Sequence, residues 1–208
     1  MATHLSIWKK SFTLLASLAF LSGGLAAQQV KVDVDDPVFE DLDSPEFNGA
    51  GSIGKKKWDP KQWLEAEVKI RIQARPEPKD GYLDELRVKW YVAVENPAGK
   101  GYFLLEKEIT YVNIPVDEDV FSSVYLSPSS IQRLTGNERA SKNDVWGVAG
   151  EVMFNGESVA TFNSQSRDKW WESPQLSRTN KFPLLSKKET PFASLWYDRY
   201  LQEQEDNR

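Results

Sequence analysis

The sequence predicts a mainly β protein, an antiparallel β-sandwich with a short inserted helix and a C-terminal amphipathic helix. Two observations support this fold class. Apolar and polar residues alternate in several segments of strand length, and turn-forming residues separate those segments. Alternation also argues against a parallel sheet covered by helices on both faces, because such strands are continuously apolar.

The clearest strand lies at residues 64–75, where apolar and charged or amide residues alternate without a break. A period of two indicates one buried and one solvated face. Glu65 and Glu67 have the parity of the solvated face. Further strands are expected at 86–94, 102–114 and 120–126.

A hairpin is predicted around Asn155-Gly156, which joins segments 145–154 and 158–162. Asn-Gly between two strands favours a two-residue turn. Such a turn would place Val152 opposite Val159 on the same face of the sheet.

Two helices are expected. Ser127 and Pro128 have the residue types of a cap and first helical position, and Gly136 ends that short helix. The second helix is predicted to begin after Thr190, the first residue of the C-terminal segment. Its apolar stripe is expected to contain the following side chains: Phe192, Leu195, Trp196 and Tyr200.

The domain organisation follows from these segments and from the N-terminus. Residues 1–26 have the basic start, short apolar run and small-residue cleavage site of a secretory signal peptide. An extended acidic arm of irregular structure is expected at 27–60, because no periodicity persists there. The sandwich is assigned to 61–189, and the C-terminal helix with a frayed tail to 190–208.

The charge and composition restrict the compartment and the partners. The net charge of −5 becomes −7 after cleavage at Ala26, since two basic and no acidic residues are removed. An acidic chain is a poor ligand for nucleic acid. The absence of cysteine and of Asn-x-Ser/Thr sites favours an exported bacterial protein, and no apolar run of the mature chain is long enough to span a membrane.

The residue types exclude most catalytic constellations. His4, in the predicted signal peptide, is the only histidine of the sequence, and cysteine is absent. This excludes Ser-His-Asp and Cys-His sites and zinc held by nitrogen or sulfur. We predict no catalytic, cofactor-binding or metal-binding residue, and no enzyme. Whether the acidic stretch 33–43 binds calcium stays open, although it lacks the spacing of a calcium loop.

The tryptophans suggest one binding hypothesis. Trp90, Trp146 and Trp196 are expected in the core. The remaining tryptophans of the mature chain lie beside charged, loop-like segments: Trp58, Trp63, Trp170 and Trp171. Exposed tryptophans on a sandwich could stack on sugar rings or contact a partner. In the alternative interpretation, they pack the arm and the late segments onto the sandwich.

Three short motifs resemble one known family. They are Asp-Pro-Val-Phe-Glu-Asp at 36–41, Trp-Asp-Pro-Lys-Gln-Trp-Leu at 58–64, and Thr-Pro-Phe-Ala-Ser-Leu-Trp-Tyr-Asp-Arg-Tyr at 190–200. The chain resembles the pilus-like proteins encoded with type IV pilus genes in verrucomicrobial bacteria. The resemblance implies an immunoglobulin-like sandwich at the cell surface, associated with a pilus or its assembly system.

One departure from true pilins refines this expectation. Residues 11–16 echo the pilin start, but Ser11 stands where pilins have the cleaved glycine and Ala16 where they have a glutamate. The apolar run also stops at Gly23. We therefore expect an accessory or peripheral pilus component rather than a major pilin.

Two functions stay open. The first is an exported structural or interaction protein that contacts pilus-associated or other envelope proteins through sheet edges or the terminal helix. The second is a carbohydrate-binding module that uses the four candidate tryptophans. Either function fits a location in the periplasm, at the outer membrane surface or outside the cell, and either is compatible with a homo-oligomer.

Overall fold

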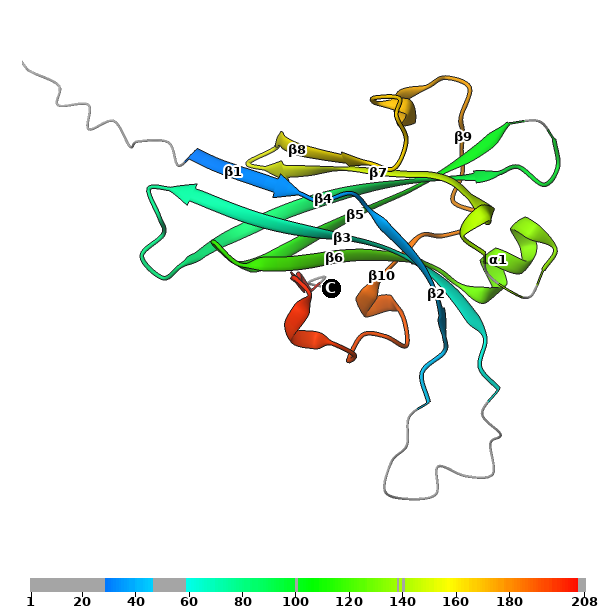
Figure 1. Ribbon diagram of the computed structural model, residues 1–208, viewed down its shortest axis with the longest axis horizontal. Helices are drawn as coiled ribbons and strands as arrows, with labels where there is room; N and C mark the ends of the chain where they lie inside the picture. Colours follow the sequence, from blue (N-terminus) through cyan, green and yellow to red (C-terminus); the bar gives the residue numbers. More distant parts are fainter. Residues whose placement is uncertain (1–28, 47–58, 100, 138, 140, 206–208) are drawn as a thin grey trace, which may run out of the picture.

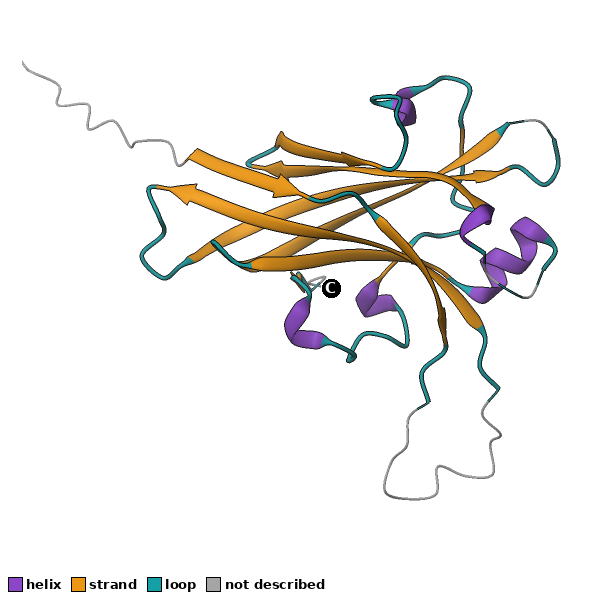
Figure 2. Ribbon diagram, in the orientation of Figure 1, coloured by secondary structure: helices purple, strands orange, loops and turns teal. Residues whose placement is uncertain are grey.

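Two sheets pack face to face in a sandwich-like arrangement (Figures 1 and 2). The computed structural model describes residues 29–46, 59–99, 101–137, 139 and 141–205. The mainly β prediction is confirmed. The immunoglobulin-like topology stays a prediction. The predicted signal peptide at 1–26 lies outside the described residues.

The first sheet has the order β1–β3–β6–β10, and β2 also pairs with β3. All its pairings are antiparallel. Its strands have the following bounds: β1 Gln29–Val34, β2 Val38–Asp43, β3 Gln62–Arg75, β6 Asp119–Leu126 and β10 Leu185–Ser186.

The second sheet has the order β11–β5–β4–β7–β8, and β9 pairs with β5 in parallel. Its strands have the following bounds: β4 Tyr82–Glu95, β5 Tyr102–Pro115, β7 Val145–Phe154, β8 Glu157–Asn163, β9 Ser177–Arg178 and β11 Gln202–Glu203. The strands expected at 64–75, 86–94, 102–114 and 120–126 are therefore confirmed.

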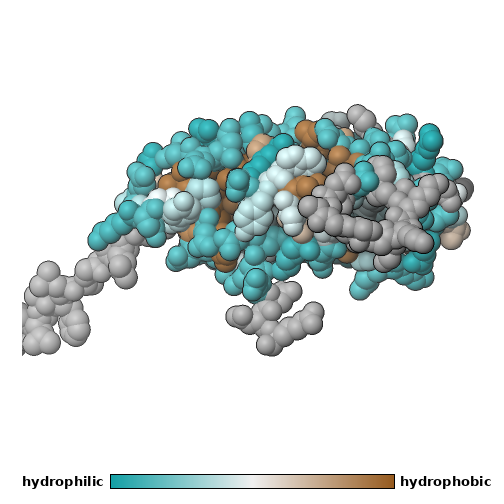
Figure 3. All heavy atoms as spheres, turned by 90° about the horizontal axis from the view of Figure 1, so that it is seen from below, coloured by the Kyte–Doolittle hydropathy of each residue, from teal (hydrophilic) through white to brown (hydrophobic). Residues whose placement is uncertain are grey.

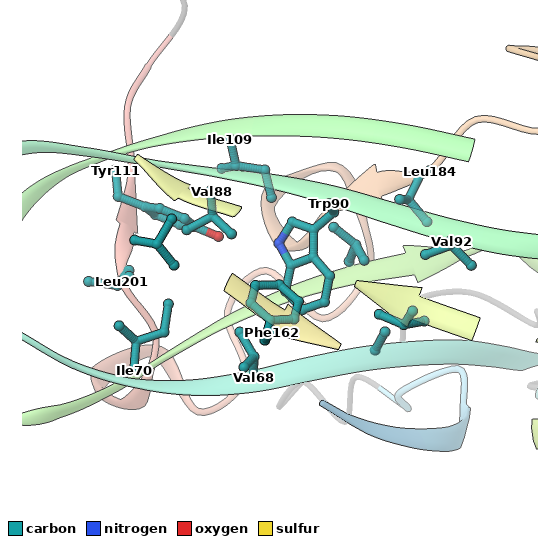
Figure 4. Close-up of a cluster of buried hydrophobic side chains, with 14 of the residues drawn as sticks. Val68, Ile70, Val88, Trp90, Val92, Ile109, Tyr111, Phe162, Leu184 and Leu201 are labelled. Carbon is teal, nitrogen blue, oxygen red and sulfur yellow. The ribbon is translucent and has the colours of Figure 1, made fainter. Parts of the chain in front are cut away.

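The main core lies between the sheets. The even-numbered residues of β3, from Leu64 to Ala74, are all buried, as their alternation predicts. Trp90 of β4 is fully buried at the centre of this core (Figure 4). Its ring meets the ring of Phe162 edge-on, with 4.7 Å between the ring centroids.

A buried hydrogen-bonded group joins the two sheets inside this core. Trp90 Nε1 donates to Ser122 Oγ over 3.1 Å, and the Tyr111 hydroxyl lies 2.6 Å from the same oxygen. Trp90 and Tyr111 belong to the second sheet, whereas Ser122 is a residue of β6 in the first. Because a buried polar group without a partner costs free energy, these bonds favour one alignment of the sheets.

The short helix α1, Pro128–Thr135, confirms the first helix prediction. Ser127 caps it by accepting a hydrogen bond from Ser130 N. Gly136 ends it in the left-handed region with φ 77°, and its N–H donates to the Gln132 carbonyl. The 3₁₀ turns are η1 Lys142–Asp144, η2 Trp170–Glu172, η3 Lys187–Glu189 and η4 Tyr197–Arg199. Across the described ranges, no helix is long and apolar enough to cross a membrane.

The Asn155-Gly156 hairpin forms with a different register. Both turn residues have positive φ, 51° and 82°, as a turn of this type requires. However, the register shifts after Val152, which pairs with Ala160. The predicted pairing of Val152 with Val159 is wrong because this irregularity inserts a residue into β8.

The predicted irregular structure of the 27–60 arm is wrong for its described strands. β1 pairs with residues 70–75 of β3, and β2 pairs with residues 62–67 along the same edge. Each strand has only six residues, too few for a persistent sequence period. They form because the long edge of β3 offers backbone groups that need hydrogen-bond partners.

The predicted C-terminal helix at 190–208 is also wrong. The segment folds into successive turns, and Trp196 has the left-handed φ of 51°. Lys187 Nζ donates to the carbonyls of Phe192 and Leu195, over 2.5 Å each. A helix would use those carbonyls for the N–H groups of residues 196 and 199. The lysine therefore occupies the acceptors that a helix needs.

Candidate interaction surface

The tryptophan pair proposed for sugar or partner contact is buried. Trp170 and Trp171 are only 1% and 2% exposed. The Trp171 ring stacks on Tyr91 with 5.4 Å between centroids, and Trp170 Nε1 donates to Asn163 Oδ1 over 2.7 Å. The two rings hold the loop after β8 against the outer face of the second sheet. They are unavailable to a sugar ring without unfolding of this loop.

Trp63 also has a packing role. It is half-buried, its Nε1 donates to Ser44 Oγ over 3.1 Å, and its ring meets Phe192 edge-on at 5.7 Å. Trp58 lies outside the described residues. The structure thus favours the packing interpretation for Trp63, Trp170 and Trp171, and their positions give the carbohydrate-binding alternative no support.

Two tryptophans expected in the main core lie elsewhere. Trp146 packs with Trp170 on the outer face of the second sheet, because a register shift between Ala93 and Val94 reverses its parity. Trp196 is 56% exposed on the turn before η4. The missing C-terminal helix explains this exposure, since the apolar stripe that would have buried Trp196 does not form.

The C-terminal segment covers the outer face of the first sheet and buries part of it. Phe192 is 1% exposed and stacks on Tyr125 with 5.3 Å between the ring centroids. Beside them, Glu65 is only 5% exposed, which contradicts its predicted solvated position. The Tyr125 hydroxyl donates to the Glu65 carboxylate, and the Tyr200 hydroxyl lies 3.2 Å from it.

This burial changes the acidity of the covered groups. Burial raises the pKa of Glu65 above its ordinary value, and the neighbouring carboxylate of Glu67 raises it further. Burial lowers the pKa of the Lys187 ammonium. The sequence contained one signal of this arrangement: an aromatic-rich segment at 190–200 must cover an apolar surface somewhere.

Three interactions hold the far end of the segment in place. Arg199 pairs with the carboxylate of Glu67, and its guanidinium lies 3.8 Å from the Phe121 ring centroid. The Tyr200 hydroxyl also hydrogen-bonds Glu67. These contacts hold the turn that carries Trp196 against β3 and β6.

The exposed large hydrophobic side chains of the described residues lie around this segment. They are Val38 (54% exposed), Tyr82 (50%), Trp196 (56%) and Tyr197 (64%). Val38 and Trp196 line a hollow of 390 Å³, here called the β2 hollow. Tyr82 and Tyr197 line a second hollow of 820 Å³, called the β4 hollow. Because Tyr200 lines both, the hollows form one surface, and pale and brown side chains gather on this side of the molecule in Figure 3.

The same surface carries carboxylates without partners. Six of them line the hollows, and their carboxylates make no hydrogen bond or ion pair within the described part of the chain: Asp36, Glu40, Asp84, Glu118, Asp198 and Glu205. The cations of the β2 hollow are already engaged, Lys69 with Asp35 over 2.8 Å and Arg199 with Glu67. We call these six carboxylates and the four exposed hydrophobic residues the aromatic–acidic face. It combines apolar area with surplus negative charge, which is typical of an interaction surface.

The acidic side chains do not converge on a point. Within the ranges that the structure describes, no group of three or more His, Cys, Asp or Glu side chains is placed to hold a metal ion. The face therefore presents carboxylates singly, along two hollows.

The fold and the aromatic–acidic face together describe a β-sandwich with an exposed surface of apolar and acidic side chains. A family model for proteins like a pilus-associated protein of Akkermansia matches residues 24–207, and the chain belongs to this family. A crystal structure from Akkermansia muciniphila is similar, with a TM-score of 0.81 and 39% sequence identity. The match covers 87% of this chain and 96% of that chain. A sequence search of curated proteins returned no match.

The family carries two consequences. Its pilus-associated member is a structural protein that belongs to no known enzyme class. Membership implies a location at the cell surface or outside the cell.

Proposed function

We propose that this protein is an exported, non-catalytic structural or interaction component of a type IV pilus-like system at the cell surface. Its partners would be pilus-associated or other envelope proteins. Since residues 11–16 depart from the pilin pattern at Ser11 and Ala16, the proposed role is that of an accessory or peripheral component rather than of a major pilin.

One observation carries the proposal. The three motifs of the family resemblance, far apart in the chain, meet on one side of the sandwich. Residues 36–41 form one wall of the β2 hollow, and residues 190–200 form the other. The third motif contributes Trp63, whose ring packs on Phe192 beneath the C-terminal segment. A shared surface built by the family motifs is best explained by a shared binding role.

The experiment is a filament co-sedimentation. Cells of the source bacterium are sheared, surface filaments are pelleted, and the proteins are identified by mass spectrometry. We expect this chain to sediment with pilus subunits and to be lost from the pellet of a pilus-assembly mutant. An abundant periplasmic enzyme serves as the contamination control. If the chain remains soluble whatever the pilus state, the pilus assignment is wrong.

A further inference from the structure

We infer that the aromatic–acidic face binds an extended segment of a partner protein that carries lysine or arginine residues. The inference rests on the proposed interaction role and specifies the chemistry of the partner. Three features support it: the shape of the β2 hollow, the unpaired carboxylates of the face and the exposed aromatic rings beside them.

The β2 hollow has the shape of a groove for a chain in extended conformation. Its floor is formed by β3, where Glu65 and Glu67 lie, one wall by β2 and the other by the turn that carries Trp196. Val38 on one wall and Trp196 on the other provide apolar area.

Charge favours a cationic segment. Asp36 and Glu40 line the β2 hollow without a cation of their own, and the β4 hollow adds four further unpaired carboxylates. A lysine or arginine side chain can pair with a carboxylate while its alkyl stem or guanidinium packs on an aromatic ring. The exposed rings of Trp196 and Tyr197 stand beside these carboxylates and suit this contact.

The same charges disfavour the other occupants. A second copy would bring its own acidic β2, with Glu40, Asp41 and Asp43, against an identical strand, and like charges repel. Nucleic acid and anionic lipid are repelled for the same reason. A neutral glycan could stack on Trp196 but would leave the unpaired carboxylates without a cation.

The test uses a fluorescent dodecapeptide of alternating lysine and threonine as the probe, with binding to the protein followed by anisotropy. We expect saturable binding that weakens about fivefold or more in the D36N/E40Q variant and in W196A. The matched control is E157Q/D168N, which makes the same change of charge at exposed carboxylates away from the face. We expect it to change the affinity less than twofold.

Several outcomes would overturn the inference. Equal weakening in E157Q/D168N would mean that the peptide senses only the general negative field. Absence of peptide binding together with binding of a chitin oligosaccharide, lost in W196A, would assign the face to glycans. Concentration-dependent self-association that W196A abolishes would make the face a contact between copies of this chain.

Unchanged circular dichroism of the variants confirms that each is folded.

The two proposals fail separately. If the native protein sediments with filaments but does not bind the peptide, the pilus role stands and the basic-partner inference is wrong. If the peptide binds at the face but the protein never sediments with filaments, the inference stands and the pilus role is wrong.

Discussion

Gly150 occupies a point of close approach on β7. A Cβ atom there would lie 2.2 Å and 2.6 Å from carbons of the Phe162 ring and 2.7 Å from the Lys89 carbonyl oxygen. The ring cannot yield freely, because it packs on Trp90 in the main core. The glycine therefore allows Phe162 to cross the strand.

We expect Gly150→Ala to lower the free energy of unfolding by about 1–3 kcal/mol through overpacking. Urea denaturation measures the change. Gly99→Ala is the matched control, because its Cβ would meet only Asn96 Nδ2, at 3.9 Å. Equal midpoints for the two variants would contradict the packing argument.

The buried Glu65 predicts a pH dependence of stability. Its pKa is raised above the ordinary 4.5 in the folded state, so the folded protein binds this proton more tightly than the unfolded chain does. The contribution of the protonated Glu65 carboxyl to the free energy of unfolding is fully present below the ordinary pKa of the unfolded chain. It is lost as the pH rises through the raised pKa of the folded protein.

We therefore expect the native protein to lose stability relative to Glu65→Gln as the pH rises from 4.5 toward neutral. Gln keeps an acceptor for the Tyr125 hydroxyl but carries no charge. Urea midpoints of both proteins, compared across this range, give the difference. The exposed Glu157→Gln is the matched control for the loss of one carboxylate. A constant gap between native protein and Glu65→Gln would show that the raised pKa is absent.

The sequence allowed the parity of β3 to be predicted but not the burial of Glu65. Alternation of apolar and polar residues identifies the two faces of a strand. It does not reveal whether a distant segment of the chain packs on the polar face and buries it. Here the cover comes from Tyr200, 135 residues away. The same limit applies to Trp170 and Trp171, whose loop setting was compatible with exposure or with packing. The structure shows that they fold back onto the outer face of β4.

At the scale of elements, the C-terminal segment depends on one buried ammonium. Lys187 holds the carbonyls of Phe192 and Leu195, and its Nζ lies 4.6 Å from the Tyr200 ring centroid. The segment has no helix to satisfy these carbonyls. Its attachment to the first sheet should therefore be sensitive to the identity of residue 187.

We expect Lys187→Met to leave the Leu195 carbonyl without its donor, at a cost of about 1–3 kcal/mol. The Phe192 carbonyl loses Lys187 but still accepts from the Leu195 N–H over 2.9 Å. Amide hydrogen exchange should accelerate by roughly tenfold or more at residues 192–201, while the core strands change little. The exposed Lys79→Met is the control. Unchanged protection at 192–201 would mean that ring packing alone holds the segment.

Elements are predicted well where apolar residues recur at a regular spacing along the whole segment. They are predicted poorly where contacts with a distant segment determine the structure. The long strands, the hairpin turn and α1 carry their own signals, as do the caps Ser127 and Gly136. β1 and β2 are too short for this, and their pairing depends on the edge of β3. The 190–200 segment shows helical spacing of apolar residues, but Lys187, outside that window, competes for its carbonyls.

At the scale of the whole molecule, two hydrophobic clusters share one strand. β4 places Trp90 and Val92 in the main core and Tyr91 and Ala93 in the cluster with Trp171 on the outer face. Successive residues of β4 pack alternately into the two clusters. Disruption of one cluster therefore destabilises β4 and, through it, the other cluster.

We expect the described fold to unfold in one cooperative step. Tryptophan fluorescence, which reports on both clusters, and far-ultraviolet circular dichroism should give coincident urea transitions. Trp171→Ala should lower the free energy of unfolding by about 3–5 kcal/mol and move both transitions together to lower urea concentrations. A fluorescence change that precedes the loss of β structure would show that the outer cluster melts alone.

The hydrogen-bonded group of Trp90, Tyr111 and Ser122 also has a consequence for divergence between relatives. Loss of the serine hydroxyl would leave an indole N–H and a phenol without their common partner in a sealed core. Single replacements at position 122 should therefore be selected against unless positions 90 and 111 change with it. The three positions are expected to covary across the family, as one inherited unit divided between two sheets.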